Sequence, residues 1–177
     1  MARGVGPGSA GVANWVREVA EADRRLGDEA KAAQTEIKRR REQFASAAGE
    51  MMTRLRSLFE TATNTFNATP PSQPVAVSRL TGSGFAVSRG SRRLTVLKSA
   101  DWNVVFSFSD PPKIDLFALL SRLDGEGVRW RLYQKSDDKD RLEAAPAEPG
   151  DLAETVSKRL FVRLVQASGP RAYRIRR

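Results

Sequence analysis

The chain has 177 residues and carries 30 Lys and Arg against 21 Asp and Glu, which gives a formal net charge of +9. It contains no Cys and no His, which excludes a disulfide framework, a Cys-based metal site, a thiol nucleophile and every His-dependent catalytic triad. No P-loop, GxGxxG or GxSxG pattern occurs either, so we expect a non-enzymatic protein that needs no cofactor and no metal.

Residues 1–11 are rich in Gly and show no periodicity, which predicts a flexible tail. This opening segment lacks the apolar core of a secretory signal. No apolar run approaches the roughly 18 residues that a transmembrane helix needs. We therefore expect a cytoplasmic protein without a transmembrane segment.

Residues 12–66 contain no Pro and are rich in Ala, Arg and Glu, which predicts one long amphipathic helix. Apolar residues recur along it in steps that average about 3.6 residues, typical of a nearly straight helix in a bundle or coiled coil. The large members of this stripe, which form the predicted helix interface, are Trp15, Val19, Leu26, Ile37, Phe44, Met51, Leu55 and Leu58. Arg40 interrupts the stripe, and we expect it to pair with Glu36 or Glu42 of a neighbouring helix.

An apolar stripe of this length requires a partner, because a lone helix cannot bury it. Three partners fit: the same helix of another subunit, a helix of a different protein, or the C-terminal part of the chain folded back. Self-association is the interpretation that we favour.

Residues 67–74 contain three Pro and predict a linker that ends the helix. From residue 75 the period shortens towards two, which indicates strands at 75–80, 85–89, 93–99, 102–108 and 128–135. The Asp110-Pro111-Pro112 sequence predicts the start of a helix that buries Leu116, Phe117, Leu120 and Leu123 and ends at Gly125.

A polar segment, residues 135–150, is expected to be a loop, and Asp151 with Glu154 predicts the start of a second helix. Residues 160–166 fit either a continuation of this helix or a strand paired with residues 171–177, and we favour the strand. The fold class is therefore α+β: a long N-terminal helix followed by a small, basic, antiparallel α+β domain over residues 75–177.

Basic side chains fall on one face of this domain. If Trp130 and Leu132 point inwards, the alternation of a strand turns their neighbours outwards together. The candidate residues for binding an anionic partner are Arg129, Arg131, Tyr133 and Lys135, Arg174 and Arg176 near the C-terminus, and Arg89, Arg92 and Arg93 at a tight turn. Arg interleaved with an aromatic suits phosphate neutralisation with base stacking, but it also occurs on the solvent face of an ordinary sheet.

Two functions follow from these patterns. The first is an assembly protein that oligomerises or docks on a larger complex through its long helix and presents the basic domain. The alternative is a nucleic-acid-binding protein that uses the Arg-rich sheet face. The anionic partner in the second case could also be an acidic protein or a lipid surface.

Overall fold

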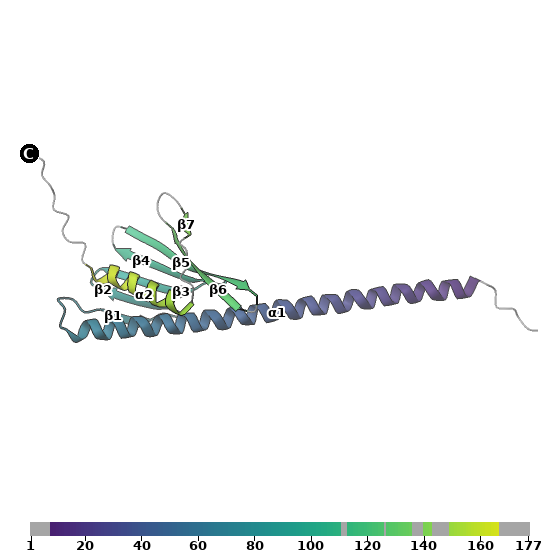
Figure 1. The fold of residues 1–177 in the computed structure, drawn as a ribbon, viewed down its shortest axis with the longest axis horizontal. Coiled ribbons are helices and arrows are strands. Elements are labelled where there is room, and N and C mark those ends of the chain that lie inside the picture. The colour runs from purple at the N-terminus through teal and green to yellow at the C-terminus, as the bar shows by residue number, and fades with distance from the viewer. Residues whose placement is uncertain (1–7, 111–112, 126, 136–139, 143–148, 167–177) are drawn as a thin grey trace, which may run out of the picture. The chain divides into compact units, whose positions relative to one another are not determined.

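The computed structural model describes residues 8–110, 113–125, 127–135, 140–142 and 149–166 (Figure 1). The chain divides into two units, Met1–Glu42 and Gln43–Arg177. The long helix α1 spans Gly8–Ala68 and is followed by seven strands and by the helix α2, Pro149–Val165. This arrangement confirms the α+β class and the antiparallel sheet that the sequence predicts.

Helix α1 ends where the sequence turns to Pro, because Pro70 and Pro71 lack the backbone N–H that a helix needs and restrict the residues before them. Asn67, in its last turn, ties the helix to the start of the sheet. The Asn67 side chain accepts a hydrogen bond from the Val75 N–H at 3.0 Å and donates one to the Val75 carbonyl at 2.8 Å. The Asn67 side chain thus holds the two ends of the segment between α1 and the first strand together.

The sheet is a meander in which each strand pairs with the next along the chain, all antiparallel. Its strands are β1 (Ala76–Arg79), β2 (Phe85–Arg89), β3 (Arg92–Lys98), β4 (Val104–Asp110), β5 (Lys113–Asp124), β6 (Gly127–Lys135) and β7 (Asp140–Leu142). Strand β7 falls in a segment that was expected to be a loop.

Strand β5 replaces the helix predicted between Asp110 and Gly125, so that prediction is wrong. Strand β5 lies between β4 and β6, and its side chains alternate between the two faces of the sheet. Phe117 and Leu119 are buried, whereas Leu116 is 40% exposed. The run Ile114–Leu120 is apolar at nearly every position, so it fits a period of two as well as a period of 3.6. Backbone pairing with a strand on either side decides in favour of the strand.

Helix α2 continues past residue 160 and ends at Val165, so the strand that we favoured for residues 160–166 is also wrong. The spacing of its buried residues explains the outcome. Leu152, Val156, Leu160 and Leu164 are fully buried at intervals of four, on one face of the helix. Residues 171–177, the expected partner strand, lie outside the described residues.

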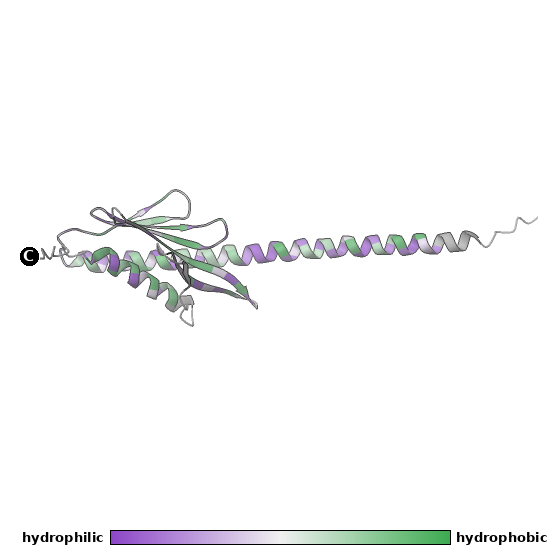
Figure 2. Cartoon of the chain, turned by 90° about the horizontal axis from the view of Figure 1, so that it is seen from above, coloured by the Kyte–Doolittle hydropathy of each residue, from purple (hydrophilic) through white to green (hydrophobic). Residues whose placement is uncertain are grey.

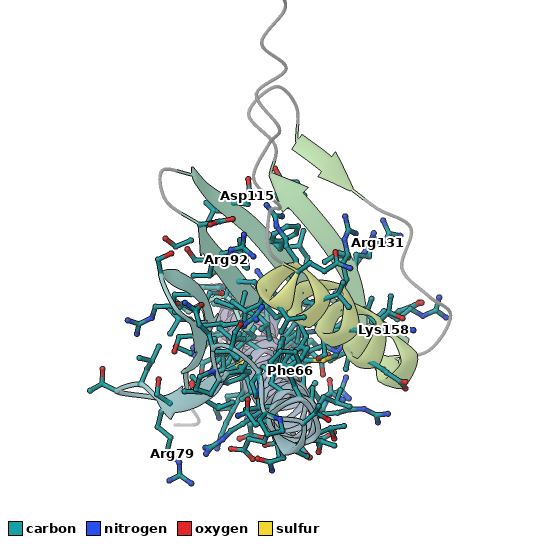
Figure 3. The ribbon with its side chains drawn as sticks, turned by 90° about the vertical axis from the view of Figure 1, so that its left-hand side faces the viewer. Phe66, Arg79, Arg92, Asp115, Arg131 and Lys158 are labelled. Carbon is teal, nitrogen blue, oxygen red and sulfur yellow. The ribbon has the colours of Figure 1, made fainter. Side chains whose placement is uncertain are left out.

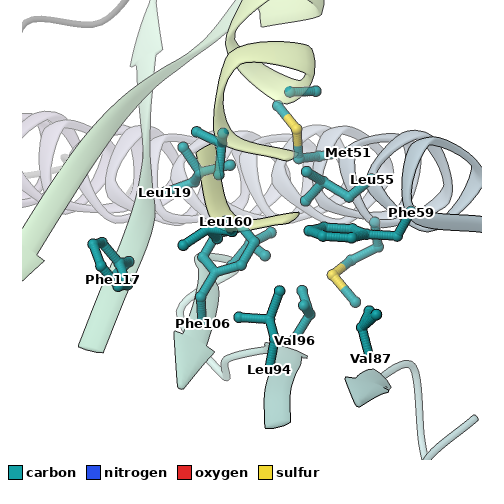
Figure 4. Packing of buried hydrophobic residues seen from close by; sticks show 14 of the residues in the cluster. Met51, Leu55, Phe59, Val87, Leu94, Val96, Phe106, Phe117, Leu119 and Leu160 are labelled. Atoms are coloured by element: carbon teal, nitrogen blue, oxygen red, sulfur yellow. The ribbon is translucent and has the colours of Figure 1, made fainter. Parts of the chain in front are cut away.

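The core of the second unit lies between one face of the sheet and two helical segments. Met51, Leu55 and Phe59 of α1 face Val87 and the neighbouring strands, with Leu160 of α2 beside them (Figure 4). The rings of Phe59 and Phe85 are 5.8 Å apart, and those of Phe59 and Phe161 are 6.5 Å apart. For the C-terminal half of the stripe, including the half-buried Leu58, the partner is therefore the chain's own sheet together with α2.

Gly49 lies on the exposed side of α1, and a Cβ atom there would meet no atom within 4 Å. Because Gly costs up to about 1 kcal/mol relative to Ala inside a helix, Gly49→Ala should raise the free energy of unfolding by about that amount. Chemical denaturation followed by circular dichroism measures the change.

Gly125→Ala is the matched control, because this site is also open but its φ is +60°. A left-handed conformation disfavours a Cβ, so this variant should lose about 1 kcal/mol. Equal effects of the two substitutions would contradict this account of the two glycines.

Candidate interaction surfaces

Arg89 and Arg92, two of the predicted anion-binding residues, point towards the C-terminal end of α2. Arg89 donates a hydrogen bond to the Val165 carbonyl, and Arg92 donates to the carbonyls of Gln166 and, at 3.5 Å, Leu164. The last carbonyls of a helix lack intrahelical partners and carry partial negative charge, so a guanidinium group there satisfies both needs. These contacts give the two arginines a structural role.

Arg92 also forms an ion pair with Asp110, in which Nε lies 3.2 Å from Oδ1, and its side chain is only 14% exposed. Figure 3 shows Arg92 beside the sheet and α2. The Arg89 guanidinium lies 5.2 Å from the ring centre of Phe66 on α1. On α2 itself, Arg163 pairs with Asp115 and lies 4.6 Å from the ring centre of Phe108. Three arginines thus fasten α2 to the sheet and to α1.

Arg92→Ala should lower the free energy of unfolding by about 1–3 kcal/mol, because it leaves helix carbonyls and the Asp110 carboxylate without their partner. Arg93→Ala is the control: Arg93 is exposed and belongs to the opposite face of β3, so its loss should change stability by no more than about 0.5 kcal/mol. Urea denaturation of both variants tests the difference, and equal losses would contradict a structural role for Arg92.

The other predicted basic residues of β6 lie on the face of the sheet away from α1 and α2, which we call the outer face. Arg129 and Arg131 are exposed and Tyr133 is half-buried, while Trp130 and Leu132 between them are buried in the core. Arg131 extends from β6 in Figure 3.

Strand β5 adds a further arginine to this face. Arg122 pairs in register with Arg129, and Arg129 lies 2.6 Å from the Asp124 carboxylate. Lys135 pairs with Leu116 through the backbone, but its side chain, like Arg174 and Arg176, lies outside what the structure describes. The described basic residues at this edge of the outer face are therefore Arg122, Arg129 and Arg131.

The middle of the outer face is apolar, which sequence reasoning missed. The strand register places Leu97, Val105, Ala118 and Tyr133 in one row across β3 to β6, and Leu116 lies next to this row. Leu97 is 43% exposed and Leu116 is 40% exposed. The signal was present in the sequence, because Leu116, Ala118 and Leu120 alternate with Phe117 and Leu119.

The first unit carries the N-terminal half of the apolar stripe, and there the large side chains are exposed. The exposed fractions are 55% for Trp15, 59% for Val19, 65% for Leu26 and 51% for Ile37. Figure 2 shows hydrophobic residues recurring among hydrophilic ones along this part of α1. Phe44, at the start of the second unit, is half-buried.

Arg40 pairs with Glu36 of its own helix, with 2.8 Å between Nε and Oε1, and Arg39 binds the same carboxylate. The hydrogen bonds from Arg39, which has the larger effect, and from Arg40 lower the pKa of Glu36 to about 2. Arg40 was predicted to pair with a glutamate of a neighbouring helix. In the structure it pairs with Glu36 of its own helix.

Among the described residues, no group of three or more acidic side chains is arranged to hold a metal ion. Within the same residues, no helix combines the length and the apolar character needed to cross a membrane. Comparison of the chain with protein-family models, with curated proteins and with solved structures gives no match.

Proposed function

We propose that this chain is a non-enzymatic assembly protein that associates through residues 14–42 of α1 and presents its α+β unit to a further partner. The observation that carries the proposal is the exposure of Trp15, Val19, Leu26 and Ile37 along one stripe of the first unit. Burial of a side chain of this size contributes about 1.5–3 kcal/mol, so four of them supply a substantial driving force for association.

The contrast between the two halves of α1 supports this interpretation. In the second unit the stripe is buried by the sheet and α2, and Ala48 and Leu55 are fully inaccessible. The same apolar pattern continues through Leu26 and Ile37 in the first unit, with more than half of each side chain exposed. A stripe that the chain itself buries in the second unit and that is exposed in the first suits a partner along the first unit.

The outer face of the sheet is the surface that the α+β unit offers. It combines an apolar centre at Leu97 and Leu116 with an edge of arginines at Arg122, Arg129 and Arg131. An apolar patch bordered by basic side chains suits a protein partner with an apolar, acidic surface.

Leu26→Glu should dissociate the full-length assembly, because it places a charge in the middle of the exposed stripe. Thr35→Glu is the matched control, since Thr35 lies about 180° around the helix from the centre of the stripe. Size-exclusion chromatography with light scattering measures the mass of both variants. A monomeric wild type, or loss of assembly in both variants alike, would contradict the proposal.

Nucleic-acid binding is the second candidate, favoured by the three arginines that share the edge of the outer face. Because phosphate binding releases counterions, affinity for single-stranded nucleic acid should fall steeply between low and physiological salt. Arg129→Glu with Arg131→Glu should abolish binding, whereas Arg79→Glu, on the short strand β1, should weaken it little. Fluorescence anisotropy measures these affinities, and retained binding in the double variant would exclude this face.

A further inference from the structure

We propose that residues 18–41 of α1 pair with the same residues of a second copy of this chain, and that the two helices run antiparallel. The inference rests on the proposed function, to which it adds the identity and the orientation of the partner. Three observations support it: the symmetry of the exposed stripe, the separation of charge along the helix, and the positions of the charges that flank the stripe.

The stripe has nearly the same spacing in both directions along the chain. Around its centre lie Ala30 and Ala33, followed outwards by Leu26 on one side and Ile37 on the other, each four residues away. An antiparallel alignment therefore places Leu26 of one copy opposite Ile37 of the other. The alanines meet at the centre, where their small side chains let the two helices approach closely.

Charge is separated along the same segment. Residues 18–29 contain five acidic and two basic side chains, whereas residues 31–41 contain five basic and one acidic. A parallel pair would set each charged half beside its own copy, so that like charges repel. An antiparallel pair sets each half beside the half of opposite charge, and this complementarity selects the orientation.

The charges nearest to the stripe agree with this choice. At about 100° per residue, Asp23 and Arg41 flank the stripe on one side, and Glu18, Arg25, Glu29 and Glu36 flank it on the other. Equivalent sides meet in an antiparallel pair, which brings Asp23 close to the partner's Arg41 and Arg25 close to the partner's Glu36. Opposite sides meet in a parallel pair, which brings Glu36 close to the partner's Arg41 but also Glu18 close to the partner's Asp23, so that one attractive contact is set against one repulsive contact.

Asp23 and Arg41, which flank the stripe on the same side, have charge that the helix itself does not pair. Within the described part of the chain, neither Asp23 nor Arg41 forms an ion pair with another side chain. Lys38, by contrast, lies 3.9 Å from Glu42, and Glu36 already binds Arg39 and Arg40. Asp23 and Arg41 are thus the pair that a second copy satisfies.

The absence of Cys from the sequence allows a direct test by disulfide cross-linking of full-length single-Cys variants. Ala30→Cys lies near the centre of the alignment and should cross-link with itself in either orientation. Ala22→Cys should not cross-link with itself, because the two copies of residue 22 are about 28 Å apart in the antiparallel pair. A mixture of Ala22→Cys and Arg40→Cys chains should form the mixed disulfide, since these positions lie on the same side of the stripe and opposite one another in the antiparallel pair.

Each outcome has a distinct meaning. The mixed disulfide, together with no self-linked Ala22→Cys, supports the antiparallel pair. Self-linked Ala22→Cys in a chain that still assembles overturns the orientation but leaves the proposed function intact. A monomeric mass by light scattering, with no cross-link at Ala30→Cys, overturns self-association itself.

Discussion

The packing of Met51, Leu55 and Phe59 on one face of the sheet is the contact on which the rest of the structure depends. The sheet has two faces, and this part of α1 determines which of them becomes the core. Helix α2 then completes the same layer, because Phe161 reaches both Phe59 and Phe66. On the other face, Leu97 and Leu116 consequently remain partly exposed.

Basic side chains serve two different purposes in the α+β unit, and the alternation of side chains between the two faces of a strand separates them. Arg92 and Arg93 are adjacent in sequence, yet one fastens the end of α2 and the other belongs to the outer face. The high positive charge of the chain therefore overstates the charge available to a ligand. Part of it is used to satisfy helix carbonyls and half-buried carboxylates.

The sequence allowed the long helix, the antiparallel sheet and most strand positions to be predicted, because their periodicities are unambiguous. It did not allow β5 to be predicted, since a run in which nearly every residue is apolar contains no period that separates a strand from a helix. The end of α2 was missed for a similar reason: Leu160, Leu164 and their neighbours fit both patterns. The error in β5 also concealed the apolar outer face, because Leu116 and Leu120 had been assigned to a core.

The order of the elements along the chain has a consequence for folding. Each strand pairs with its nearest neighbour in sequence, so the sheet can form from local hairpins soon after its residues are synthesised. Its two covering layers lie at opposite ends of this sequence: residues 43–68 precede the sheet and α2 follows it. During translation the inner face therefore stays half-covered until the last helix has emerged, and over that interval Phe85, Phe106 and Phe108 are open to aggregation or to a chaperone.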